Sequence, residues 1–136
     1  MFKYMVWILP VVLIIFSGCS GGTNVQLGEK FTLSIGESAS ISGEDLEVYF
    51  KEVVGDSRCP QGVTCIWAGE ATSVIKITHS GTSYEKVLTQ PGLTEPPQDE
   101  FQDYIIVFDL KPYPQENVQT GEEDYRLQLE IRKKAG

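Results

Sequence analysis

Two cysteines and a histidine are the residues of this chain that could do redox or metal chemistry. Cys59 and Cys65 are separated by five residues, a wider spacing than the Cys-x-x-Cys pair that lowers a thiol pKa at a helix start. With His79 they supply at most three soft or borderline ligands for copper or zinc, because Met1 and Met5 lie in the N-terminal apolar segment. A redox or soft-metal-binding domain using Cys59 and Cys65 is therefore the alternative function, while His79 is predicted to be a rim residue at a strand end.

Hydrolytic chemistry has no local signal in the sequence. The chain has one histidine, no Gly-x-Ser-x-Gly elbow and no His-Glu-x-x-His helix, which are the patterns of serine and zinc hydrolases. Two acidic clusters, residues 95–100 and 122–124, lack the spaced oxygen ligands of a calcium loop and are predicted to be solvated. We predict a protein that is not an enzyme and that holds no metal and no cofactor.

The N-terminal segment has the order of a signal peptide. Lys3 precedes an apolar run from Met5 to Phe16, which is shorter than the roughly 20 residues of a membrane-spanning helix. Ser17-Gly18-Cys19 then resembles the lipobox of prokaryotic lipoproteins, in which the cysteine sulfur takes a diacylglyceryl group and the freed amine becomes the new N-terminus.

The lipobox resemblance implies a cleaved signal peptide over residues 1–18 and a lipidated Cys19, whose acyl chains, palmitate among them, hold the protein on a membrane. The address is then the cell membrane or the outer membrane, facing the extracytoplasmic side. Phe16 stands where the family usually has leucine or another aliphatic residue, so cleavage by an ordinary signal peptidase is the alternative.

The two remaining cysteines form an even pair once Cys19 is assigned to lipid by that resemblance. An oxidising compartment lets disulfides persist. The intervening Pro60 and Gly62 let the chain turn, so the two Cα atoms can approach within the roughly 4.4 to 6.8 Å that a disulfide requires. We predict a Cys59–Cys65 disulfide whose small ring contributes about 2.4 kcal/mol in the chain-entropy model, so it shapes a loop more than it stabilises the fold.

The cysteines lie in the most specific string of the chain, which runs from Asp56 to Gly69. Asp-Ser-Arg-Cys-Pro, a spacer and Cys-Ile-Trp-Ala-Gly resemble a motif of small, mostly uncharacterised prokaryotic lipoproteins and secreted proteins. The likeness is strong over this string and looser in Pro112-Tyr113-Pro114 and in the final Tyr-x-Leu-x-Leu segment. It supports the fold and the compartment, and it carries no catalytic assignment.

Two interpretations of this string are open. In the structural one, Trp67 caps an end of the domain against the disulfide, Asp56 and Ser57 satisfy turn amides, and Arg58 pairs with Asp56 or Glu70. In the functional one, Arg58 and Trp67, with Asp56 and Glu70 beside them, form a recognition surface, since arginine and tryptophan are enriched among interface hot spots.

The elements that must position this string are strands. Apolar and polar residues alternate over 31–35, 46–50 and 125–131, which is typical of strands with one wet face. Ser80-Gly81-Thr82 predicts a hairpin turn between antiparallel strands over 71–79 and 84–89. The segment 104–110 is apolar on both parities, so we predict a central strand that is covered on both sides.

Short strands with Gly, Pro and Asn between them, and no amphipathic helical repeat, predict an all-β fold. We expect an antiparallel two-sheet sandwich, with an immunoglobulin-like arrangement as one option. The predicted organisation is a cleaved signal peptide over 1–18, a lipidated N-terminus and flexible tether over 19–27, and a single β-sandwich domain over 28–134. Function is expected on the long loops 56–69 and 90–102, because long loops on a rigid sandwich are where binding residues concentrate.

The charge balance narrows the partners. The chain carries −8 at pH 7, which argues against nucleic acid and against lying flat on anionic lipid. We predict a monomer, attached to the membrane through its lipid anchor, that acts as a binding or envelope-interaction module. Its ligand class, whether protein, peptide or glycan, stays open.

Overall fold

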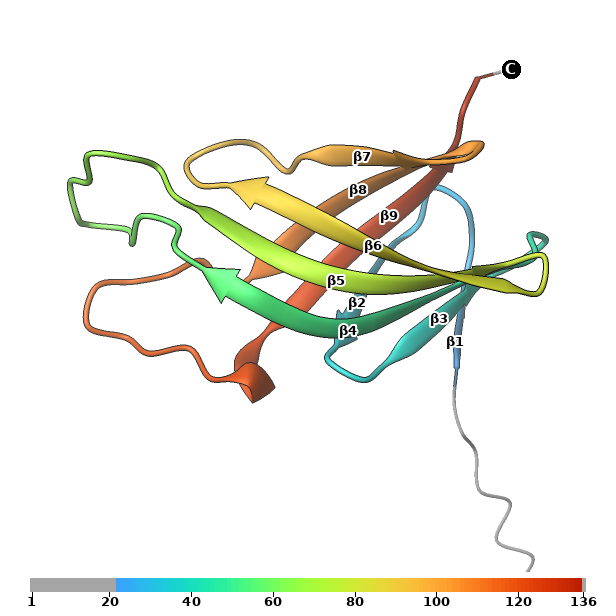
Figure 1. Cartoon of the computed structure of the whole chain (residues 1–136), viewed down its shortest axis with the longest axis horizontal. Helices are drawn as coiled ribbons and strands as arrows, with labels where there is room; N and C mark the ends of the chain where they lie inside the picture. Colours follow the sequence, from blue (N-terminus) through green and yellow to red (C-terminus); the bar gives the residue numbers. More distant parts are fainter. Residues whose placement is uncertain (1–21, 136) are drawn as a thin grey trace, which may run out of the picture.

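The computed structural model describes residues 22–135, which form nine β-strands and one short 3-10 helix (Figure 1). These elements are β1 (Thr23–Val25), β2 (Lys30–Ser34), β3 (Ser38–Ile41), β4 (Leu46–Asp56), β5 (Glu70–His79), β6 (Thr82–Pro91), β7 (Gln98–Phe101), β8 (Tyr104–Lys111), η1 (Glu122–Asp124) and β9 (Arg126–Lys133). None of the described residues belongs to a helix long and apolar enough to cross a membrane. The all-β prediction is confirmed over this part of the chain.

Two sheets pack on each other as a sandwich, as predicted. One sheet has the strand order β1-β3-β4-β5-β6 and the other β2-β9-β8-β7. The ladders are antiparallel apart from β1 with β3, which is parallel. The four consecutive strands β3 to β6 form a meander, an order that differs from the ABED and CFG sheets of immunoglobulin domains.

Period-two alternation places the core between the sheets. Every second residue of β2, β8 and the first half of β4 is apolar and buried, while most of the residues between them face outward. The final segment follows the same rule, since Tyr125, Leu127, Leu129 and Ile131 are all buried. The core of the described residues runs from Val25 to Ile131, so a chain that starts at Ser20 contains all of it.

One expectation for the central strand β8 is wrong. Tyr104, Ile106, Phe108 and Leu110 are buried, but the residues of the other parity are only half-buried. The reason is architectural, because in an antiparallel sandwich each sheet is covered on one face by its partner sheet. The outer face of β8 and β9 instead borders a shallow groove of about 380 Å³ beside residues 95–98.

The folded domain begins earlier than residue 28. Thr23–Val25, placed in the flexible tether by composition, forms β1 and pairs with β3. Val25 is 3% exposed and Leu27 packs against the core, so burial of two apolar side chains fixes this segment. The signal peptide and the lipid acceptor Cys19 lie outside the described residues.

The predicted hairpin between β5 and β6 is confirmed. The two strands pair without a break from Glu70 with Pro91 to His79 with Thr82. Ser80 and Gly81, at the turn, both have positive φ, 50° and 77°, which is the backbone that a two-residue hairpin of the right-handed twist requires. His79 lies at this end of the sandwich, where its Nδ1 is 2.7 Å from the carbonyl oxygen of Asp45.

Candidate functional site

Three segments meet at the end of the sandwich opposite the β5–β6 turn, and we call residues 57–69, 92–97 and 112–121 together the loop end (Figure 1). Backbone hydrogen bonds tie them to one another. The amide of Gly92 donates to the carbonyl of Gly69 at 2.9 Å, and the amide of Gln61 donates to the carbonyl of Pro114 at 2.9 Å. The loop end is therefore one connected surface.

The strand β4 delivers Asp56 to the inside of this end through two irregularities. Its register against β5 shifts between Phe50 and Glu52 and again between Val53 and Gly55. Each β-bulge adds a residue and rotates the following side chains. As a result Phe50, Val53 and Asp56 all point inward at a spacing of three, and a carboxylate ends up under the loops.

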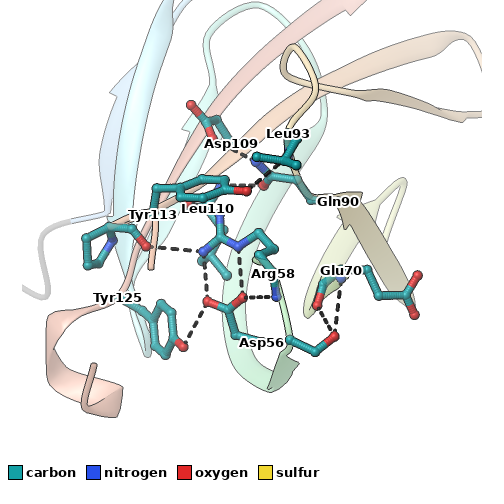
Figure 2. A network of polar contacts seen from close by, with 11 residues as sticks. Asp56, Arg58, Glu70, Gln90, Leu93, Asp109, Leu110, Tyr113 and Tyr125 are labelled. Atoms are coloured by element: carbon teal, nitrogen blue, oxygen red, sulfur yellow. Dashed lines mark hydrogen bonds and ion pairs between the residues drawn. The ribbon is translucent and has the colours of Figure 1, made fainter. Parts of the chain in front are cut away.

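Asp56 and Arg58 form a buried ion pair beneath the loop end (Figure 2). Nε of Arg58 donates to Oδ1 of Asp56 and Nη2 donates to Oδ2, both at 2.8 Å. The side chain of Arg58 is 0% exposed and that of Asp56 is 7% exposed. Two parallel N–H···O bonds of this kind are the strongest geometry available to an arginine–carboxylate pair.

The guanidinium also binds the end of β8 and the residue after it. Nη1 of Arg58 donates to the carbonyl of Leu110 at 2.8 Å, and Nη2 donates to that of Pro112 at 3.1 Å. The ring of Tyr113 covers it, with 4.9 Å from Cζ to the ring centroid. One side chain thus joins the segment after β4 to the segment after β8, and it does so from inside the protein.

The electrostatics of the pair favour its charged form. Burial alone would raise the pKa of Asp56, but the hydrogen bonds and the positive charge of Arg58 outweigh it and hold that pKa below its ordinary value. The hydroxyl of Tyr125 donates to Oδ2 of Asp56 at 3.2 Å. Burial, followed by the Asp56 charge, raises the pKa of Tyr125 in turn. These shifts describe a structural ion pair, since both partners are enclosed.

Gln90 completes the buried polar framework and had no signal in the sequence. It is 4% exposed; its Nε2 donates to Oδ1 of Asp109 at 2.9 Å and its Oε1 accepts from the amide of Leu110 at 2.7 Å. Gln90 is on β6 and its partners are on β8, so the contact joins the two sheets (Figure 2). Throughout residues 22–135, each buried side-chain nitrogen or oxygen has a hydrogen-bond partner.

The predicted disulfide is present. Cys59 and Cys65 are bonded with their Cα atoms 6.0 Å apart, inside the range expected for the bridge. Cys59 is 3% exposed, and its amide donates to the carbonyl of Ala68 at 2.8 Å. Within the described part of the chain no three His, Cys, Asp or Glu side chains are grouped so as to hold a metal ion.

Close backbone contact fixes where the loop returns to the sheet. Gly69 has φ +69°, and a Cβ there would lie 1.8 Å from the carbonyl oxygen of Ser57. Ser57 also bonds Glu70 through its backbone and its hydroxyl. The Gly of the Trp-Ala-Gly string is therefore required by geometry.

The far part of the loop is exposed, and we call Val63, Ile66 and Trp67 the tip. Ile66 is 91% exposed and Trp67 80%. Leu93, on the neighbouring segment, is 69% exposed. Of the eight large apolar residues exposed in the described structure, five belong to the loop end: Val63, Ile66, Trp67, Leu93 and Val118.

The four residues expected to form a surface separate into two groups. Arg58 and Asp56 are enclosed, so the structure corrects the idea that they meet a ligand; their pairing is that of the structural interpretation. Trp67 and Glu70 are exposed. The indole of Trp67 stands in solvent, so its expected role as a cap on the disulfide is corrected too. Neither outcome could be read from composition.

Comparison of the chain with protein-family models, with curated proteins and with solved structures found no match in any of the three.

Proposed function

We propose that the protein is a membrane-anchored extracytoplasmic lipoprotein that acts as an envelope-interaction module and binds through its loop end. The observation that carries this proposal is the tip, where Ile66 and Trp67 stand almost fully exposed on a loop whose base is fixed from inside. Contiguous exposed apolar groups on a soluble domain mark interaction sites.

The absence of charge at the tip supports binding there. Residues 59–69 contain no charged side chain, and residues 112–121 contain only Glu116, in a chain of which 22% of residues are charged. An uncharged apolar surface can be dried on contact without leaving an unpaired ion. The disulfide and the Arg58 framework hold the loop in one shape before contact, which lowers the ordering cost of binding.

The anchor rests on the lipobox resemblance at Cys19. Four Cα-to-Cα steps of at most ~3.6 Å separate that residue from Thr23, where β1 begins, so the Cα atom that carries the lipidated side chain would lie within about 14 Å of the Cα atom of Thr23. This span is shorter than the tether expected from the sequence. A lipidated chain would thus keep the domain against the bilayer that anchors it.

The anchor is tested with the full-length chain and its Cys19→Ser variant, expressed in a bacterial host and separated into membrane and soluble fractions. We expect wild type in the membrane fraction with the added mass of acyl chains, and the variant without that mass. Wild type that lacks the acyl mass would refute the anchor.

Binding through the loop end is tested with the Ser20–Gly136 domain and isolated envelope fragments. We expect an Ile66→Ser/Trp67→Ser variant to lose co-sedimentation and a Val87→Ser variant to retain it, because Val87 is also exposed (56%) but lies on β6. Equal binding of both variants would refute the proposal. Alkylation of the same domain before and after reduction tests the redox or soft-metal alternative, which requires free thiols at Cys59 and Cys65.

A further inference from the structure

From the shape and chemistry of the tip, we infer that the envelope component it contacts is the lipid–water interface of a zwitterionic bilayer. This inference rests on the proposed function and names the partner of its loop end. The protein would then touch the membrane twice, once through the lipid at Cys19 and once through Ile66 and Trp67.

The side chains of the tip project from the loop. Exposures of 91% and 80% mean that Ile66 and Trp67 pack little against the rest of the domain, so these two side chains project into solvent. A bilayer accepts a projecting apolar group without a complementary cavity. Tryptophan, with an apolar ring and one N–H, is the side chain enriched at the level of lipid headgroups.

The charge of the tip and of the domain favours a zwitterionic lipid over an anionic one. No charged residue lies within residues 59–69, while the chain as a whole carries −8. The exposed Glu95 lies within the loop end and the exposed Glu70 directly follows residue 69. An anionic bilayer would repel this acidic domain, whereas zwitterionic headgroups would not. The contact should therefore weaken as anionic lipid is added.

The backbone limits how deep the tip can go. Ile66 and Trp67 form a bend outside any strand, and peptide groups without partners are costly in hydrocarbon. The hydrated headgroup layer supplies those partners. Insertion is therefore confined to that layer, with the indole at headgroup depth.

The position of the N-terminus is compatible with two contacts on one membrane. Thr23 pairs with Ala39, which pairs with Val48. Val48 and Asp56 lie opposite Ile77 and Ala71 on β5, so β4 advances by roughly 20 Å between them. The described chain begins at the edge strand β1 of its sheet (Figure 1). Both contacts meet one bilayer if this separation runs along the membrane surface.

The fluorescence of Trp67 tests the inference directly, because the other tryptophan of the chain is Trp7 and the Ser20–Gly136 domain contains Trp67 alone. Phosphatidylcholine vesicles should shift its emission to the blue. Nitroxide probes at the headgroup should quench it more than probes deep in the acyl chains. Ile66→Ser should lower the partition coefficient about tenfold, as expected for one large apolar side chain, and Val87→Ser should leave it unchanged.

Three results would overturn the inference: no blue shift at millimolar phosphatidylcholine, equal partitioning of Ile66→Ser and wild type, or stronger binding as phosphatidylglycerol is added. If vesicles fail while envelope fragments still bind in a tip-dependent way, the partner is a protein or glycan. In that case the lipid inference is refuted and the proposed function stands. Loss of both would refute the two together.

Discussion

The two halves of the 57–69 segment contrast sharply. At its base, Arg58 is enclosed and satisfied by Asp56, Leu110 and Pro112; at its tip, Ile66 and Trp67 are exposed and unpacked. The polar side chain is inside and the apolar side chains are outside, the reverse of the usual distribution. A loop with this inversion separates the task of holding its shape from the task of meeting a partner.

The inversion follows from what surrounds each half. At the base, two bulges in β4 turn a carboxylate inward. The carbonyls of Leu110, at the end of β8, and of Pro112, just after it, both accept from the forked guanidinium of Arg58. At the tip, Ile66 and Trp67 follow the ring that the disulfide closes over residues 59–65, and neither side chain belongs to the core. Stability should therefore depend on the base and contact should depend on the tip.

The largest loss of stability is expected from Arg58→Met, because this variant removes the buried cation at the base of the loop. It leaves the buried Asp56 carboxylate without its ion-pair partner and two carbonyls without donors, and loss of one partner of a buried pair costs about 3–5 kcal/mol. Urea unfolding of the Ser20–Gly136 domain measures the loss. Arg58→Lys keeps the charge but not the paired geometry, so its free energy of unfolding should lie between those of wild type and Arg58→Met.

Lys51→Met is the matched control for that measurement. Lys51 pairs with Glu85 at 2.5 Å, but the side chains are 42% and 59% exposed, and exposed pairs contribute little. The Lys51→Met variant should unfold at the same urea midpoint as wild type. Equal losses for Arg58→Met and Lys51→Met would mean that burial of the Asp56 pair has no energetic consequence.

A smaller effect is expected when the loop is opened. Replacing both cysteines, Cys59→Ala with Cys65→Ala, removes a short ring and should cost about 2 kcal/mol. Reduction of the wild-type domain should give the same unfolding midpoint as the double variant. If the double cysteine variant lost more stability than Arg58→Met, the disulfide, and not the Arg58 framework beneath the loop, would be what mainly holds the loop in shape.

Strand positions were predictable because period-two alternation is visible wherever one face is buried, as at Leu127, Leu129 and Ile131. The same rule explains two failures. It does not detect β1, where three residues are too few to show a period, and it ends at Phe50, since the bulges of β4 change the spacing of inward residues from two to three.

The site was predictable as a location and not as a surface. Asp56, Arg58 and Trp67 all belong to the string singled out by its cysteines, but burial depends on contacts with residues about fifty positions away, Leu110 and Pro112. A sequence shows a charged residue and an aromatic residue, and composition assigns the first to solvent and the second to the core. Here tertiary contacts bury Arg58, whereas Trp67 packs little against the domain and stays exposed.

The acid dependence of stability tests the buried Asp56 pair, with a smaller expected loss of stability. The pKa of Asp56 is lowered in the folded protein, so its contribution to stability is complete above the ordinary aspartate value of about 3.9 and is lost as the pH falls through the lower, folded value. Urea midpoints of wild type should therefore fall more steeply below about pH 4 than those of Asp56→Asn. Parallel curves would contradict the pairing.

The alkaline side provides the control at the other end of the sandwich. Burial, with the hydrogen bond to Glu44, raises the pKa of Tyr104 to about 12. A raised value means that the contribution of Tyr104 is complete below its ordinary value of about 10 and is lost as the pH rises toward 12. Tyr104→Phe should reduce this alkaline slope and leave the part that Tyr125, whose pKa is also raised, contributes. On the acid side it should remove only the contribution of Glu44, whose pKa the Tyr104 hydrogen bond lowers.

The smallest effect on stability is expected at the tip. An Ile66→Ser/Trp67→Ser variant should unfold within about 0.5 kcal/mol of wild type, because side chains without packing partners have little to lose. Ile75→Ala in the core, where Ile75 is fully buried, should cost about 2–5 kcal/mol. If the tip variant approached the core variant, the tip would pack in solution and its exposed apolar groups would need no partner. If it does not, the fold gains nothing from Ile66 and Trp67, and both side chains are available for a contact outside the protein.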